Sequence, residues 1–284
     1  MAIVRPSVPA DIPAQRQLWQ LAFGDDGAYV DNFYTAYYRP ERVLVLEEAG
    51  AVRAMTAWFD TAFVVPGRGK FRAAYLYAVA THPEWRGRGL AGELLARADS
   101  FFRAWDIPAV TTVPAEPSLH NFFGGNGFRE CFVHGQFRYD RPAAPVPAEG
   151  ELEALSPAAY AALREERLAG RAHIALSPEV MVYQAGACAL APGGGLYALD
   201  TPRGRAALCA EGMGDGSLLV KELLCPPGEL ENILARLPAL LPRWSGLYRT
   251  PDGDIPFGML KWLDPALDRA WDWSSAAYLG LAFD

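Results

Sequence analysis

The chain has 284 residues, of which 51% are hydrophobic and 21% are charged. This is the composition of an ordinary globular protein, and the length favours two domains. The formal net charge of −7 at pH 7 argues against a nucleic-acid partner, because phosphate neutralisation requires an excess of Lys and Arg. The four cysteines are scattered and no histidines cluster, so we expect buried free thiols and no metal site. With no signal-peptide pattern and no long apolar run, we expect a cytoplasmic protein without a membrane span.

The first expected elements are two helices. Asp11 precedes residues 12–23, in which Leu18 and Leu21 follow helical spacing, and Asp is a favourable N-cap. Residues 28–38 repeat aromatic side chains every four positions, which indicates a second helix.

Short β-branched and aromatic runs follow the helices, at residues 42–48, 51–60 and 70–81. Glycine-containing turns separate them, so we predict antiparallel strands. A helix is expected at 90–105. The remaining elements of this half are a strand at 109–115, a short helix at 118–124 and a strand at 130–140.

The Pro- and Ala-rich segment 141–151 is the expected linker between domains 1–140 and 152–284. Beyond it we predict a helix at 156–170 with Ser156 as N-cap. The later elements are strands at 181–191, 195–201, 205–212 and 217–225, a helix at 229–241, and strands at 246–250 and 257–263. The fold class predicted is α/β in the wide sense (α+β with a mixed sheet), and the second half coarsely repeats the first.

Residues 81–95, THPEWRGRGLAGELL, bring glycines between an apolar run and a helical pattern. The first N–H groups of a helix have no intrahelical partner, and the helix dipole adds partial positive charge there. Glycines let an anion approach the backbone, and Arg86 and Arg88 could add charge-assisted hydrogen bonds. Taken alone, such a short motif more often marks a tight turn with solvated arginines.

The same loop satisfies the literal dinucleotide pattern, since residues 87–92 read GRGLAG. Its context argues against a nicotinamide enzyme. Antiparallel hairpins precede the loop in place of the first strand of a βαβ unit, and no acidic strand end follows about twenty residues on.

The segment VATHPEWRGRGLAGELL resembles the acetyl-CoA-binding motif of the GNAT superfamily of N-acetyltransferases, with Arg86, Gly89 and Ala91 at the motif positions. The opening residues and the later SLHNFFGGNGF also fit the family, so the resemblance covers roughly residues 1–140. It implies a GNAT fold and acetyl-CoA as cosubstrate. The cofactor-binding residues that it implies are Val79, Ala80, Thr81, Arg86, Gly87, Arg88, Gly89, Leu90, Ala91, Gly92, Ser118 and Asn121.

The sequence differs from the family pattern at the residue that usually acts as the acid and protonates the leaving thiolate. The family commonly has Tyr four residues before the closing Gly-Phe pair, which here is Gly127-Phe128, and this chain has Phe123 instead. Three explanations remain open. The thiolate leaves unaided, since thiols ionise near pH 8.5; another donor such as His120, Asn121 or Ser118 acts through water; or turnover is poor.

Candidates for the base are Glu116, Asp60, His82 and His134, each of which also has an ordinary structural explanation. A further candidate, implied by tandem members of the family, is a C-terminal carboxylate at Asp284. The catalytic residues predicted are therefore Glu116, His120 and Asp284.

The second half lacks the Arg-Gly loop. At the equivalent place Pro226-Pro227 precede the predicted helix, and proline has no N–H to offer a phosphate. We therefore expect residues 152–284 to form a degenerate GNAT-like domain that walls the acceptor cleft.

The expected function is transfer of an acetyl group from acetyl-CoA to a primary amine of a small molecule or peptide. The alternative is a regulatory protein that senses acyl-CoA on the same scaffold with weak or no catalysis. The sequence leaves the acceptor and the oligomeric state open.

Overall fold

The structure is a computed structural model that describes residues 2–140, 151–241 and 245–283. Within these ranges the strands form one mixed sheet in the order β1-β2-β3-β4-β5-β12-β11-β10-β9-β7, with β6 paired to β12 and β8 paired to β3. The strands are β1 (Ile3–Pro6), β2 (Val43–Glu48), β3 (Ala51–Val65), β4 (Gly69–Thr81), β5 (Ala109–Thr112), β6 (Arg129–Tyr139), β7 (Leu152–Ala154), β8 (His173–Leu176), β9 (Gly195–Thr201), β10 (Gly204–Gly212), β11 (Leu218–Leu224) and β12 (Gly246–Trp262).

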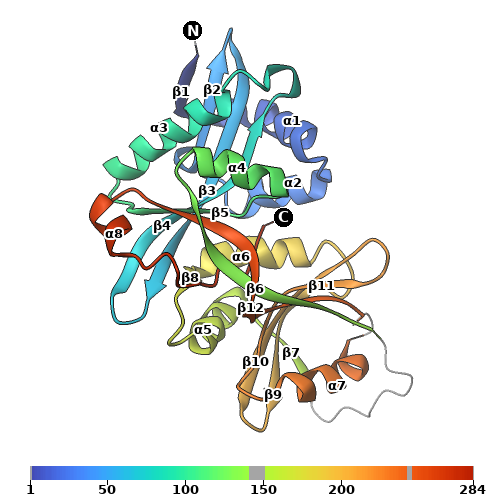
Figure 1. Cartoon of the computed structure of the whole chain (residues 1–284). Helices are drawn as coiled ribbons and strands as arrows, with labels where there is room; N and C mark the ends of the chain where they lie inside the picture. The colour runs from blue at the N-terminus through green and yellow to red at the C-terminus, as the bar shows by residue number, and fades with distance from the viewer. Residues whose placement is uncertain (1, 141–150, 242–244, 284) are drawn as a thin grey trace.

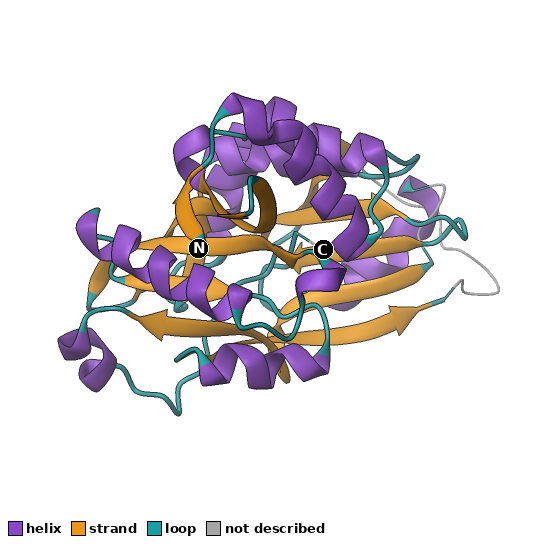
Figure 2. Ribbon diagram, turned by 90° about the horizontal axis from the view of Figure 1, so that it is seen from above, coloured by secondary structure: helices purple, strands orange, loops and turns teal. Residues whose placement is uncertain are grey.

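Helices cover both faces of this sheet (Figure 2). They are α1 (Ile12–Phe23), α2 (Gly27–Ala36), α3 (Leu90–Ala104), α4 (Pro117–Gly125), α5 (Pro157–Arg167), α6 (Pro178–Cys188), α7 (Leu230–Leu240) and α8 (Pro265–Ala270), with short 3-10 turns at Pro9–Asp11, Pro40–Arg42 and Pro83–Trp85. The expected α/β architecture with a mixed sheet is confirmed.

In the first half, side chains along a strand alternate between two hydrophobic cores, one on each face of the sheet. Val43 and Val45 of β2 belong to the core that contains α1 and α2 residues such as Trp19 and Phe33. Leu44 and Leu46 face the other core, which α3 and α4 cover. Successive side chains of a strand point to opposite faces, so the sheet separates α1 and α2 from α3 and α4.

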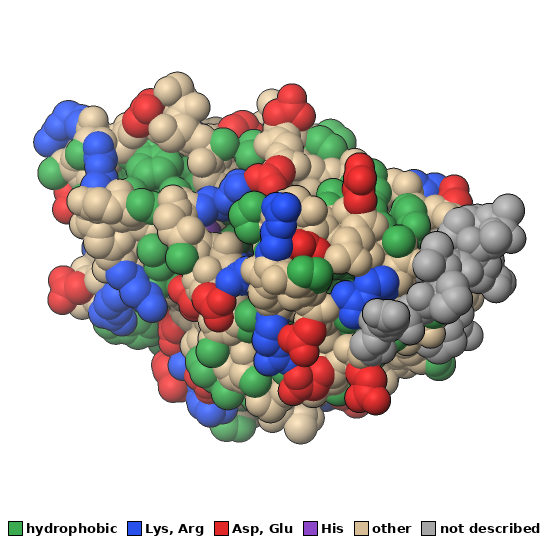
Figure 3. Space-filling view, turned by 90° about the horizontal axis from the view of Figure 1, so that it is seen from below, with side chains coloured by type: hydrophobic (Ala, Val, Ile, Leu, Met, Phe, Trp, Pro, Cys, Tyr) green, Lys and Arg blue, Asp and Glu red, His purple; other side chains and the backbone are tan. Residues whose placement is uncertain are grey.

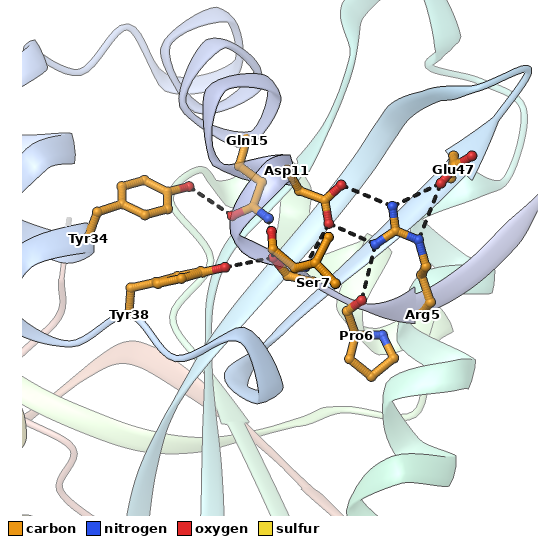
Figure 4. Close-up of polar contacts among 9 residues, drawn as sticks. Arg5, Pro6, Ser7, Asp11, Gln15, Tyr34, Tyr38 and Glu47 are labelled. Atoms are coloured by element: carbon orange, nitrogen blue, oxygen red, sulfur yellow. Dashed lines mark hydrogen bonds and ion pairs between the residues drawn. The ribbon is translucent and has the colours of Figure 1, made fainter.

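The first helix begins at Ile12, as predicted, but Asp11 does not cap it through its side chain. Its carboxylate instead accepts hydrogen bonds from the Arg5 guanidinium at 2.7 and 2.9 Å and from the Val8 N–H at 2.8 Å (Figure 4). The hydrogen bond from Arg5 lowers the pKa of Asp11. Arg5 also binds Glu47, so this cluster fixes the start of α1 against β1 and β2.

One predicted strand is wrong. Residues 181–191 were expected to be extended, but residues 178–188 form α6. The Ser177 side chain accepts a hydrogen bond from the Val180 N–H and Pro178 stands in the first turn, both of which favour a helix start. The buried residues of this helix lie on one face, but that face includes Gln184, and the exposed positions include Pro178 and Val182. The helix therefore lacks the polar stripe by which an amphipathic helix is recognised.

The sheet runs through both halves of the chain without a break (Figure 1). Two separate closing strands were predicted, whereas β12 is a single strand. It pairs with β11 at Gly246–Tyr248, with β5 at Met259–Trp262, and with β6 along most of its length. Residues 141–150 of the expected linker lie outside the described residues, so the division into domains 1–140 and 152–284 stays a prediction.

The second half repeats one supersecondary unit of the first. β4 and β5 are parallel neighbours joined through α3, and β11 and β12 are parallel neighbours joined through α7.

On the lower face, acidic and basic side chains are interspersed (Figure 3). No helix in the described part of the chain is long and apolar enough to cross a membrane.

Candidate active site

The site begins where two parallel strands separate. β4 pairs with β5 from Ala73 to Tyr75, opposite Ala109 to Thr111. β4 then continues to Thr81, whereas β5 ends at Thr112. Among the described residues, the β5-facing edge of β4 therefore has no strand partner beyond Tyr75, and residues 76–79 line a pocket in which a ligand could reach the backbone.

A β-bulge lies in the part of β4 that pairs with β3 but no longer with β5. Opposite β3, Tyr77 pairs with Ala57 and Ala80 pairs with Met55, so two residues of β4 face one residue of β3. Ala78 within the bulge has φ +50°, a conformation uncommon for a residue other than glycine. Bulges of this kind re-aim the chain and are frequent beside active sites. Val79, Ala80 and Thr81, predicted to hold the cofactor, follow directly.

The gap between the strands opens into a pocket of about 260 Å³. Its walls come from β4, β5, the end of α1, α4 and the C-terminal segment. The residues lining it are Trp19, Phe23, Asp25, Tyr75, Leu76, Tyr77, Ala78, Val79, Thr112, Val113, Ala115, Leu119, Phe123, Ala282 and Phe283. The pocket is thus apolar and aromatic, with few polar groups.

The glycine loop joins the far end of β4 to α3. Gly87 and Gly89 have φ of +75° and +78°, values that L-residues with side chains adopt only with strain. Gly89 is the N-cap residue of α3, and residues 86–89 are exposed. The orphan N–H groups of the first turn, Leu90 to Gly92, therefore begin at the surface, which suits an anion.

Two arginines flank this helix start. Arg86 donates from Nε to the Thr81 carbonyl at 3.3 Å. The Arg88 guanidinium lies 4.4 Å from the Trp85 ring, and Arg53 lies 4.3 Å from the same ring. Cation–π contacts hold such side chains in place while the charge stays exposed, so the loop carries positive charge in a chain of net charge −7.

The departure at residue 123 lies directly on the pocket. Phe123 of α4 is 4% exposed and lines the cavity, with its ring 5.5 Å from that of Phe128. A phenol at this position would have brought a hydroxyl to the same wall.

Glu116 and His120, two other catalytic candidates, are not among the residues that line the pocket. His120 is on α4 but outside the pocket lining, and its Nδ1 lies 2.6 Å from Glu130 Oε1. Glu116 is exposed and accepts a hydrogen bond from Ser118 Oγ at 3.4 Å. Ser118 and Asn121 are exposed on α4. Asp284 lies outside the described residues.

The three weaker base candidates have structural surroundings. Asp60 pairs with Arg42 at 2.8 Å. His134 is buried and stacks on Phe257 with ring centroids 4.3 Å apart. His82 is half-buried at the end of β4. None of these three lines the pocket among the described residues.

Trp19, Asp25 and Phe283 were not singled out from the sequence. Trp19 is fully buried, and its indole N–H donates to Asp25 Oδ2 at 2.8 Å. A local sequence pattern could have identified Trp19 and Asp25, because Trp19 and Phe23 share a helix face and Asp25 comes just after the helix ends. Phe283 carries no such signal, since its neighbours are distant in sequence.

The C-terminal segment passes through the core to reach the pocket. The Tyr278 N–H donates to the Ala172 carbonyl, and the Ile174 N–H donates to the Tyr278 carbonyl. Phe283 is 4% exposed and packs on Phe59 and Tyr75, with ring centroids 4.4 and 5.3 Å away. The described chain therefore ends at the pocket wall.

A cluster of three phenols, two from the first half and one from the second, supports this wall. The hydroxyl of Tyr77 lies 2.7 Å from that of Tyr183 on α6 and 3.1 Å from that of Tyr29 on α2. Burial raises the pKa of both Tyr77 and Tyr183 well above the ordinary value. All three act as neutral hydrogen-bonding groups that join α6 to the first half.

Comparisons with known proteins agree with this architecture. Residues 4–127 match the description of an acetyltransferase (GNAT) domain. A comparison with curated protein sequences found no match.

Solved structures extend the similarity to most of the chain. A GCN5-related N-acetyltransferase from Anabaena variabilis has a TM-score of 0.70 at 16% identity, over 93% of this chain and 73% of that one. Eis1 from Mycobacterium abscessus has a TM-score of 0.67 at 17% identity, over 92% and 74%. A GCN5-related N-acetyltransferase from Kribbella flavida has a TM-score of 0.66 at 16% identity, over 93% and 71%. At this identity the likeness is one of fold, while the match to the family model identifies residues 4–127 as similar to a GNAT acetyltransferase domain.

Proposed function

We propose that the protein is an acetyl-CoA-dependent N-acetyltransferase that transfers the acetyl group directly to a primary amine in a ternary complex. The observation that carries the proposal is the continuity of three features along one strand. The aromatic pocket, the bulge at Ala78 and the glycine loop before α3 follow one another along β4. This order matches the order of the parts of acetyl-CoA, with the thioester at the pocket, the pantetheine arm at the bulge and the pyrophosphate at the glycine loop.

In this proposal the pyrophosphate binds at residues 86–92, where exposed N–H groups and two arginines favour an anion. The pantetheine arm lies along the free edge of Val79, Ala80 and Thr81. Ser118 and Asn121 contact the cofactor from α4. The thioester then enters the gap between β4 and β5.

The chemistry requires a neutral amine, a stabilised oxyanion and a leaving thiolate. The amine nitrogen attacks the carbonyl carbon, the C–S bond breaks, and the ammonium proton passes to a base. A backbone N–H of the free β4 edge, near Val79 or Thr81, is positioned to donate to the carbonyl oxygen as negative charge develops on it.

The second half contributes to the acceptor side of the cleft. Tyr183 of α6 supports the Tyr77 wall, and Ala282 and Phe283 of the C-terminal segment line the pocket. Pro226 and Pro227 occupy the place of the glycine loop before α7, so residues 152–284 are proposed to be a degenerate GNAT-like domain without its own acetyl-CoA site.

We expect Phe123→Tyr to raise kcat roughly tenfold while leaving the affinity for acetyl-CoA unchanged. The new hydroxyl would protonate the leaving thiolate, and a positioned acid contributes about 10²–10⁴-fold where it is needed. Steady-state thiol release measures the effect. Phe128→Tyr is the matched control, because Phe128 is in the same cluster but does not line the pocket. An equal response of both variants would contradict an acid role at residue 123.

We expect deletion of Asp284 to lower kcat about 100-fold, as loss of a general base does, without changing the Kd of acetyl-CoA. The basis is that Phe283 ends the described chain at the pocket wall. Asp284→Asn keeps the C-terminal carboxylate but removes the side-chain carboxylate, so this variant shows which of the two groups acts as the base. Unchanged rates in both variants would return the base role to Glu116 or to the His120–Glu130 pair acting through water.

The deciding experiment is thiol release from acetyl-CoA with a broad amine panel, run beside calorimetric titration with CoA. Acceptor-dependent release supports the transferase. Tight CoA binding with no release for any amine would instead favour an acyl-CoA sensor on the same scaffold, the alternative that the missing hydroxyl at Phe123 keeps open.

A further inference from the structure

The end of α1 and the residues just after it place three side chains in the pocket wall. Trp19 and Phe23 are four residues apart and lie on the same helix face. The helix then ends at Gly24, whose φ of +74° reverses the chain. Asp25 returns to the same side, where its Oδ2 accepts the Trp19 indole N–H at 2.8 Å, and all three line the pocket.

The pocket holds a single carboxylate in an aromatic enclosure. Among its described lining residues, Asp25 is the only one with an acidic or basic side chain. One carboxylate oxygen is held by Trp19, and the other has no protein partner among the described residues. The Tyr77 hydroxyl is engaged by Tyr183 and Tyr29, so that tyrosine offers its ring to the cavity.

Size and exposure narrow the ligand further. Pockets for drug-sized ligands measure about 300–1,000 Å³, whereas this one measures about 260 Å³ and must also admit the thioester. Phe23 lines it while remaining 43% exposed, so an apolar ring stands at the solvent side of the cavity. Such a ring gains contact area only when an apolar ligand covers it.

We propose that the acceptor is a small primary monoamine carried on an aromatic body, an arylalkylamine. Asp25 attracts its single ammonium group into the pocket, and the base then removes a proton so that the neutral amine can attack the thioester. The rings of Trp19, Tyr77, Phe23 and Phe283 enclose the aryl group. A polycation is disfavoured because each further ammonium would lose water without a carboxylate to receive it. This inference rests on the proposed acetyl transfer and specifies its acceptor.

The test compares kcat/KM for 2-phenylethylamine and tryptamine with that for spermidine and kanamycin, using the full chain and saturating acetyl-CoA. The arylalkylamines should be preferred at least tenfold. A preference for spermidine or kanamycin would overturn the acceptor class and leave the transferase intact. Binding of acetyl-CoA without thiol release for any amine would overturn the transferase itself.

Two pairs of variants locate the preference in the pocket. Asp25→Asn should raise KM for 2-phenylethylamine about tenfold with kcat within twofold, whereas Asp26→Asn should not, because Asp26 is an exposed N-cap outside the pocket. Phe23→Ala should raise KM for tryptamine about fivefold. Leu21→Ala should not, since Leu21 is 48% exposed on the same helix and does not line the cavity. Equal effects within either pair would refute the assignment.

Discussion

Replacing Gly89 by proline should raise the Kd of acetyl-CoA roughly 100-fold or more. Gly89 has φ +78°, and proline is fixed near −65°, so the loop must change course before α3. Proline also removes an N–H from the proposed phosphate site. A hydrogen bond to a charged group is worth about 1.5–3 kcal/mol, and each 1.4 kcal/mol is a factor of ten in affinity. Calorimetric titration with acetyl-CoA measures the loss.

Two controls separate loop chemistry from general damage. Gly89→Ala keeps the N–H, and its added Cβ would meet no atom within 4 Å, so its effect should be limited to backbone strain. Gly67→Pro meets the same incompatibility at φ +73°, but at the opposite end of β4. If Gly89→Pro binds acetyl-CoA as Gly67→Pro does, the phosphate site is not at this loop.

The parts of the fold that could be predicted from the sequence are those governed by local chemistry. The helix at 12–23 follows from apolar spacing, and the glycine loop follows from its position between a strand and a helix. Both depend on residues within one or two turns of each other. The mixed sheet follows in outline, because each strand carries its own β-branched and aromatic run.

What could not be predicted depends on contacts between distant segments. Phe283 reaches Phe59 and Tyr75 across more than 200 residues, and no spacing rule encodes that contact. The strand β12 pairs with strands of both halves, whereas its middle residues Pro251, Asp252 and Gly253 are typical of a turn, so the sequence predicts two strands there. The helix α6 lacks a polar stripe because its exposed positions include Pro178 and Val182, while its buried face, where Tyr183 meets Tyr77, carries the polar Gln184.

Replacing Glu222 by alanine should lower the free energy of unfolding by about 3–5 kcal/mol, the usual cost of leaving a buried charge without its partner. Glu222 and Arg164 are both fully buried, with Arg164 Nε 3.0 Å from Glu222 Oε2. Burial by itself would lower the pKa of Arg164, but the Glu222 carboxylate together with Tyr278 and Glu165 outweighs burial, and the pKa is raised. Tyr160 would also lose the carboxylate that accepts its hydroxyl at 3.0 Å. Urea unfolding measures the change.

The matched control is Glu153→Ala, which removes an exposed partner of Arg205 and should change stability by less than about 1 kcal/mol. The double variant Arg164→Met with Glu222→Leu should be more stable than Glu222→Ala, because it leaves no unpaired buried charge. Equal stability of Glu222→Ala and Glu153→Ala would refute the argument.

The same pair links stability to the site. Arg164 Nη2 donates to the Leu279 carbonyl at 2.8 Å, and Nη1 donates to the Ile174 carbonyl at 2.7 Å. Glu222 therefore orients the guanidinium that holds the C-terminal segment against β8, four residues before Phe283 enters the pocket wall. Because Phe283 lines the pocket whereas residues 86–89 of the glycine loop do not, Glu222→Gln at a temperature where it remains folded should raise the acceptor KM more than the Kd of acetyl-CoA. A parallel loss of both would mean that the segment does not act through the acceptor pocket.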